Sequence, residues 1–199
     1  RRRIAQGSPL SPSQKESALD IRVVAGDVTS FAGDGLVVNL FEGVGAPAKG
    51  IRRGRVRVAR PLGGATGAVD VALGGAITRL IQAGEATGKW GEQTLVHSLG
   101  RLPVERILVM GLGKREEFTL DRVRVVAAEA ARAFRKIGAR RIGTVAHGAG
   151  AGGFNAAQSA QALAEGTLLG LYRFTRYKTN NDTAKAIERV TVIERDPKR

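Results

Sequence analysis

The sequence contains no cysteine and only two histidines, His97 and His147. Without cysteine the chain has no disulfide framework, no thiolate nucleophile and no cysteine-based zinc site. No apolar run approaches the roughly 18–20 residues that a membrane span needs. The basic N-terminal segment also lacks the apolar stretch of a signal peptide. These absences together favour a cytoplasmic protein that makes no membrane contact.

Familiar catalytic motifs are also missing from the sequence. It has no H-E-x-x-H pair, no dense acidic cluster and no G-x-S-x-G elbow. His97 lies in the predicted strand "TLVHSL", and we expect it to be a packed residue rather than a base. His147 follows a predicted strand beside a glycine-rich loop, which is a better catalytic position, but no acidic residue lies near it in sequence. We therefore assign no catalytic residue and no metal ligand to this chain.

Positive charge is abundant, with 32 lysines and arginines against 18 acidic residues. The segment "KGIRRGRVRVAR", residues 49–60, is basic and holds no acidic residue. Such a field attracts polyanions, so a nucleic-acid interface is one interpretation. A solvated basic loop is the alternative that we favour, because alternating Arg and Val also suit an exposed strand. The arginines of the first interpretation are Arg52, Arg53, Arg55 and Arg57.

Strand patterns alternate with helix patterns along the chain. This order predicts one α/β domain with a mostly parallel or mixed sheet covered by helices. Thr119 suits the N-cap of the second helix, and Asn155 with Gln158 resembles a capping box at the third. We predict strands over 21–25, 35–40, 95–99, 106–110, 142–146 and 190–193, and helical segments over 63–85, 119–138 and 155–177.

Polar residues and glycine loops follow several of these strands. Asp27 and Asn39 lie at strand ends, where each could bind a ligand, or could cap a turn or end a strand. Glycine loops at 63–67 and 148–153 precede helices, whose N-terminal N–H groups can bind an anion. Neither loop is a P-loop, because no Gly-Lys-Ser/Thr follows. Tight turns without a ligand are the alternative for both loops.

Four ordered stretches carry a resemblance to a known family. They are "IRVVAGDVTSFAGDGLVVNLFEG", "GGATGAVDVALGGAI", "ILVMGLGKREEFTLDRVR" and "ALAEGTLLGLYRFTRYK". Together they resemble the N-terminal domain of the leucyl aminopeptidases, which are dinuclear-metal exopeptidases. The resemblance implies a domain over 20–195. The preceding segment, 1–19, is basic and rich in Ser, Pro and Gln, and we expect it to be a disordered tail. A basic insertion at about 44–62 departs from the family pattern.

That N-terminal domain is itself similar to macro domains, which bind ADP-ribose. The similarity implies a three-layer α/β/α fold with a mixed central sheet. In the macro domains the matching aspartate contacts adenine, the matching asparagine lies near the distal ribose, and the matching loops hold the diphosphate. The ligand residues that the similarity implies here are Asp27, Asn39, Gly63, Gly64, Gly148, Gly150 and Phe154.

The family resemblance also implies what the rest of such a protein contains. The metal ligands of the family and its two divalent ions, zinc or manganese, belong to a C-terminal catalytic domain, and this sequence ends at Arg199 before such a domain. We therefore expect no cofactor in this chain and no activity from it alone. Its expected partners are its own catalytic domain and further copies in a hexamer that shields the active sites. The alternatives are a stand-alone ADP-ribose module and a DNA-binding accessory domain that uses the arginine-rich insertion.

Overall fold

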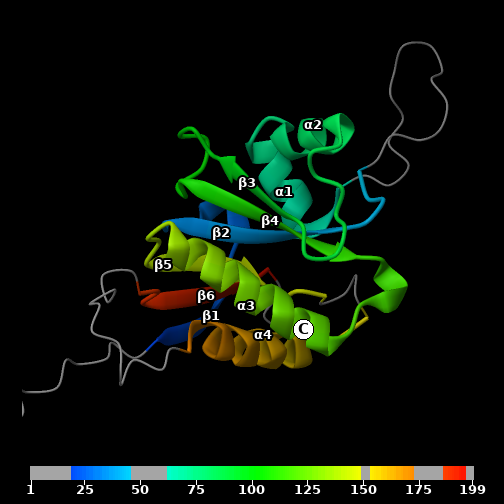
Figure 1. The fold of residues 1–199 in the computed structure, drawn as a ribbon. Coiled ribbons are helices and arrows are strands. Elements are labelled where there is room, and N and C mark those ends of the chain that lie inside the picture. Colours follow the sequence, from blue (N-terminus) through cyan, green and yellow to red (C-terminus); the bar gives the residue numbers. More distant parts are fainter. Residues whose placement is uncertain (1–18, 46–61, 149–152, 173–185, 196–199) are drawn as a thin grey trace, which may run out of the picture.

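The computed structural model describes residues 19–45, 62–148, 153–172 and 186–195 (Figure 1). The strands are β1 (Asp20–Ala25), β2 (Gly35–Phe41), β3 (Gln93–His97), β4 (Arg106–Gly113), β5 (Arg141–Val145) and β6 (Arg189–Glu194). The helices are α1 (Gly64–Ala72), α2 (Ala76–Ala83), α3 (Leu120–Lys136) and α4 (Ala156–Leu171), with short 3-10 turns η1 (Val28–Ser30) and η2 (Arg115–Glu117). The predicted tail up to residue 18 and most of the insertion, 46–61, lie outside the described residues.

The six strands form one sheet in the order β1-β6-β5-β2-β4-β3. Every neighbouring pair is parallel except β3 and β4, which are antiparallel. The predicted mixed α/β sheet is therefore confirmed. Because five strands run the same way, their carboxyl ends meet at one edge of the sheet, where α/β proteins commonly bind ligands.

Helices cover both faces of the sheet, and α1 and α2 lie opposite α3 and α4 (Figure 1). The alternation of side chains along β2 explains this division. Val37 packs in the hydrophobic cluster beneath α3 and α4, whereas Leu36 and Val38 pack in the cluster beneath α1 and α2. A strand buried on both faces needs a continuous apolar run, and "GLVVNLF" supplies one that only Asn39 interrupts.

The segment predicted as one helical stretch over 63–85 is two helices. Its apolar residues keep their helical spacing, but the chain turns between α1 and α2 at Gly74 and Gly75, whose φ angles are +66° and +81°. Glycine adopts this left-handed conformation without steric cost. Buried Asp70 then accepts hydrogen bonds from the main-chain N–H and the hydroxyl of Thr78, at 3.0 and 2.5 Å, and holds the start of α2.

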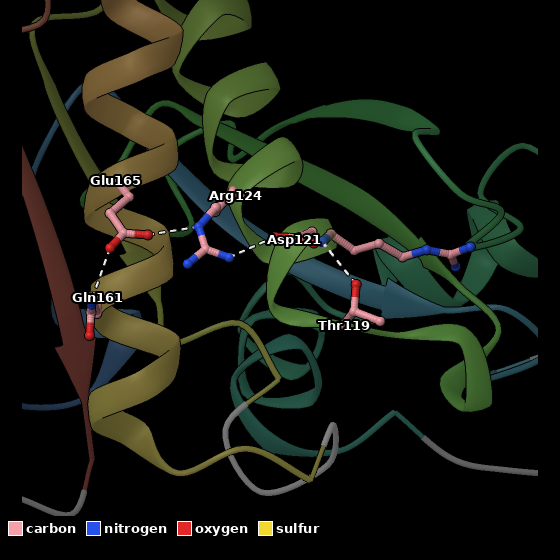
Figure 2. Close-up of polar contacts among 6 residues, drawn as sticks. Thr119, Asp121, Arg124, Gln161 and Glu165 are labelled. Atoms are coloured by element: carbon pink, nitrogen blue, oxygen red, sulfur yellow. Dashed lines mark hydrogen bonds and ion pairs between the residues drawn. The ribbon is translucent and has the colours of Figure 1, made fainter.

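Helices α3 and α4 pack closely against each other. A Cβ at Gly166 would overlap the main-chain oxygen of Arg124, so only glycine fits there. Arg124 also donates to Glu165 of α4 at 2.7 Å and to Asp121 of α3 at 2.8 Å (Figure 2). Gln161 donates to the other oxygen of the Glu165 carboxylate at 2.8 Å. A line of charged contacts therefore joins the two helices along their exposed edge.

The predicted caps are confirmed, and several predicted element ends are wrong. Thr119 caps α3, and Asn155 with Gln158 forms the capping box of α4. Strand β3 ends at His97 instead of Leu99, and β4 continues to Gly113. Beyond residue 172 the predicted end of the third helix lies outside the described residues. No helix among the described residues is both long and apolar enough to cross a bilayer.

Candidate functional site

One cavity of about 790 Å³ opens at the carboxyl edge of the sheet. Its walls come from the ends of β1, β2, β5 and β6 and from the starts of α1 and α4. Of the seven ligand residues predicted from the sequence, six line this cavity: Asp27, Asn39, Gly63, Gly64, Gly148 and Phe154. Gly150 lies outside the described residues. The fold therefore gathers the described members of the predicted site, and their ligand contacts stay a prediction.

Asp27 both caps a turn and faces the cavity. Its Oδ1 accepts from the main-chain N–H of Thr29 at 2.8 Å and from the Thr29 hydroxyl at 2.7 Å, so the turn-cap interpretation is confirmed. These bonds, first from the hydroxyl and then from the N–H, hold the pKa of Asp27 below its usual range. A carboxylate at this edge of the cavity is therefore ionised at neutral pH and can accept from a ligand.

The N-termini of two helices border the same cavity. Helix α1 begins at Gly64 after Gly63, and α4 begins at Ala156 after the capping residue Asn155. The unpaired N–H groups at a helix start carry partial positive charge and attract anions. Two arginines that the sequence reasoning missed, Arg115 and Arg195, add full positive charges to the lining. The cavity is thus suited to an anionic group such as a phosphate.

Phe41 and Phe154 line the cavity, and the buried ring of Phe118 contacts both of them. Phe118 contacts Phe41 edge to face with ring centroids 5.2 Å apart, and it contacts Phe154 at 6.0 Å. The guanidinium of Arg115 lies 5.2 Å from the centroid of the Phe41 ring. Arg115 follows β4 at the edge that β2 also reaches, so parallel pairing of these strands was the signal that could have identified it.

His147 lies behind the wall of the cavity rather than in it. Ala146 and Gly148 line the cavity on either side, while the His147 side chain is only 1% exposed. Its Nδ1 is 3.1 Å from Asn39 Nδ2, and its Nε2 is 3.1 Å from Thr144 Oγ1. Burial lowers the pKa of His147 to about 4, so the ring is neutral at physiological pH. Buried and doubly bonded, it is not placed to exchange protons with a ligand.

The prediction that His97 is packed is wrong. His97 is exposed on β3, as is Leu95, which is 43% exposed, whereas Val96 between them is buried. Strand β3 is the edge strand next to β4, and alternate residues point away from the core. The register of the strand, which the sequence did not settle, decides which residues are buried.

No group of three or more His, Cys, Asp or Glu residues in the described part of the chain could hold a metal ion. The described residues therefore do not fit the dinuclear metal centre of an aminopeptidase. The arginines predicted to contact nucleic acid, Arg52, Arg53, Arg55 and Arg57, lie outside the described residues, and their role stays a prediction.

Comparison with known proteins decides the family. The model described as "Cytosol aminopeptidase family, N-terminal domain" matches residues 56–181. The chain belongs to the cytosol aminopeptidase family. A probable cytosol aminopeptidase from Alkaliphilus metalliredigens is 35% identical over 170 residues, which is 85% of this chain and 30% of the relative. The domain spans about a quarter to a third of the length of the curated relatives it matches.

Solved structures confirm the fold of this aminopeptidase domain. The chain matches a mutant of tomato leucine aminopeptidase at a TM-score of 0.70 and 19% identity. The match covers 93% of this chain and 34% of the tomato protein. A Trypanosoma brucei macrodomain solved in complex with ADP matches 90% of the chain and 65% of itself, at a TM-score of 0.64 and 17% identity. The predicted macro-domain-like α/β fold is therefore confirmed.

Proposed function

We propose that the chain is the non-catalytic N-terminal domain of a metal-dependent leucyl aminopeptidase. In this proposal residues 20–195 form the domain, and a catalytic domain of the same protein carries two divalent ions, zinc or manganese. That second domain removes N-terminal amino acids from peptides in the cytoplasm. The N-terminal domain contributes to a homo-hexamer and shields the active sites inside it.

The observation that carries this proposal is the family match together with its extent. The relatives are cytosol aminopeptidases by name, and the chain aligns with a quarter to a third of their length. One structural fact agrees with a non-catalytic role. His147 is enclosed and forms hydrogen bonds within the chain, to Asn39 and to Thr144.

The experiment compares the 199-residue chain with the gene product that its source cell makes. Both are assayed on a leucyl amide with manganese and then with zinc, and sedimentation gives the oligomeric state of each. We expect hydrolysis and a hexamer from the native gene product and no hydrolysis from the chain alone. Metal-dependent hydrolysis by the purified chain would overturn the proposal.

We also propose a second function, in which the cavity binds ADP-ribose or a related nucleotide. The observation that favours it is that six predicted ligand residues meet around a cavity bordered by two helix N-termini and two arginines. A similarly folded macrodomain has been solved with ADP. Asp27 is suited to accept from an adenine amino group, and the helix starts are suited to the diphosphate.

Calorimetry with ADP-ribose tests this second function. Binding is expected for the chain, and Asp27→Asn should weaken it because the charged acceptor is lost while the turn cap keeps an oxygen. Glu105→Gln is the matched control. Glu105 immediately precedes β4, at the end of that strand away from the cavity, and its side chain is 73% exposed. Absence of heat at millimolar ADP-ribose would remove the nucleotide proposal and leave the aminopeptidase proposal intact.

A further inference from the structure

The buried histidine at the end of β5 has a specific place beside the cavity. His147 and Asn39 are 108 positions apart in the sequence, yet the fold brings Asn39 Nδ2 to 3.1 Å from His147 Nδ1. Asn39 lines the cavity, whereas the histidine ring is enclosed behind it. A contact between a buried ring and a cavity-lining amide can determine what that amide offers to a ligand.

The hydrogen-bond partners fix the direction of this contact. An amide Nδ2 only donates, so Nδ1 of His147 must accept and the ring proton must be on Nε2. The Nε2–H then donates to Thr144 Oγ1 at 3.1 Å, and the Thr144 hydroxyl donates to the main-chain oxygen of Val145 at 3.4 Å. Each donor in this series meets an acceptor, so the arrangement is self-consistent.

The opposite arrangement satisfies fewer groups. If the Asn39 amide were rotated by half a turn, its oxygen would face His147, and Nδ1 would have to carry the proton. Nε2 would then need the Thr144 hydroxyl as its donor, and the Val145 oxygen would lose that donor. In that arrangement the ring keeps a partner at each nitrogen, and the loss falls on the main-chain oxygen of Val145. The arrangement with the proton on Nε2 therefore satisfies one more hydrogen bond than the opposite one.

The backbone of Asn39 is held as well. Thr66 of α1 is buried and donates from its hydroxyl to the main-chain oxygen of Asn39 at 2.6 Å. The residue is therefore held by α1 through its backbone and, through its side chain, by His147, which follows β5. Among the described residues no protein group donates to Asn39 Oδ1, which is the atom left to the cavity.

We propose that His147 is a positioning residue that orients the Asn39 amide, so that Oδ1 faces the cavity as a fixed hydrogen-bond acceptor. The ligand group at this point is then a donor, such as a sugar hydroxyl, and a carbonyl or phosphate oxygen is disfavoured there. The ligand part of this inference rests on the proposed nucleotide function. The orientation itself is a property of the protein without ligand.

Nuclear magnetic resonance on the unliganded 199-residue chain tests the orientation directly. Nitrogen and carbon shifts of the His147 ring report which nitrogen is protonated, and a scalar coupling between Asn39 Nδ2 and His147 Nδ1 reports the N–H···N bond. We expect the Nε2–H form and a measurable coupling. His97→Gln leaves one histidine and so assigns the ring signals. A protonated Nδ1 without the coupling would overturn the proposal.

Two variants of His147 separate positioning from packing. His147→Asn can place an amide oxygen near the position of Nδ1 and accept from Asn39, whereas His147→Leu fills the space without an acceptor. We expect distinct, slowly exchanging Asn39 side-chain amide signals in the wild type and in His147→Asn, and their loss in His147→Leu. Equal amide signals in the two variants, with both folded, would contradict the positioning role.

ADP-ribose is the ligand probe for the second half of the inference. Loss of one positioned hydrogen bond corresponds to about a tenfold weaker Kd, so His147→Leu should bind about tenfold more weakly, and His147→Asn should bind nearly as the wild type does. Equal weakening in both variants would contradict the role of Asn39 as a fixed acceptor. If ADP-ribose gives no heat with the wild type while the coupling is present, the nucleotide function fails and the orientation of Asn39 stands.

Discussion

The two helical layers cover the same sheet by different means. In the layer of α3 and α4, two long helices approach so closely that glycine is required where Gly166 meets the backbone of Arg124. In the layer of α1 and α2, two short helices are separated by left-handed glycines and ordered by side chains such as Asp70 and Thr66, which bond to the backbone.

Both layers reach the cavity, through the N-termini of α1 and α4, so the difference between them concerns stability. In the close-packed layer, the buried apolar side chains of α3 and α4 form one cluster with those of the sheet. The layer of short helices borders the cavity through the start of α1, where Gly63 and Gly64 leave main-chain N–H groups accessible. We therefore expect the largest stability losses from changes in the first layer and smaller losses from changes in the second.

The largest expected effect comes from Gly166→Ala. In an ordinary helix this change stabilises by about 1 kcal/mol. Here the new Cβ would overlap the Arg124 main-chain oxygen, so we expect a net loss of about 3 kcal/mol in the free energy of unfolding. Urea denaturation measures it. Gly26→Ala is the control, because a Cβ there meets nothing within 4 Å; equal effects at the two glycines would contradict the close-packing account.

The second effect is a pH dependence of the free energy of unfolding. It arises from His147, which lies beside α3 and α4. Burial lowers the pKa of His147 to about 4 from 6.5, so between these values the unfolded chain binds a proton that the folded chain does not. The contribution of the neutral, buried His147 ring to the free energy of unfolding is complete above pH 6.5. It is lost as the pH falls toward 4. The expected loss is roughly 1 kcal/mol for each pH unit in that window.

Urea denaturation between pH 7 and pH 4 measures this slope. We expect His147→Asn to flatten the curve and His97→Gln, at the exposed edge strand, to leave it nearly unchanged. A slope that persists in a folded His147→Asn protein would assign the pH dependence to other groups.

A smaller effect is expected in the layer of short helices. Asp70→Ala removes both acceptors of Thr78 at the start of α2, and loss of such a cap costs about 1–2 kcal/mol. Thermal unfolding measures this loss, and Thr78→Val, which keeps the main-chain bond, should cost less. An Asp70→Ala loss that matched the loss from Gly166→Ala would remove the distinction between the layers.

The smallest effect is expected from the charged line along α3 and α4. Arg124 and Glu165 are each more than a third exposed, so solvent and salt screen their interaction. Glu165→Gln should shift the thermal midpoint only slightly, and the shift should shrink further at high salt. Glu129→Gln, which affects the Arg132 pair within α3 alone, is the matched control. A large shift that salt does not change would show that these contacts are structural.

The sequence predicted those parts of the fold that local chemistry decides. Apolar periodicity indicated all six strands, and the side chains of Thr119 and Asn155 marked the starts of two helices. The co-location of Asp27, Asn39 and the glycine loops was also implied, because parallel strands bring their carboxyl ends to one edge.

Long-range contacts account for what could not be predicted. Helical spacing continues through Leu73 and Ile77, so it concealed the turn at Gly74 and Gly75. The contact between Asn39 and His147 depends on β2 and β5 becoming neighbours, which no local pattern states. The exposure of His97 depends likewise on the register of an edge strand.

The intact mass of the protein from its source cell tests the central claim most directly. The 199-residue chain has a mass of 21.0 kDa and aligns with 30% of the length of the relative from Alkaliphilus metalliredigens. The account predicts a native mass well above 21.0 kDa, with a catalytic domain making up the difference. A native mass near 21.0 kDa would contradict the aminopeptidase assignment of function and leave the nucleotide cavity as the leading site.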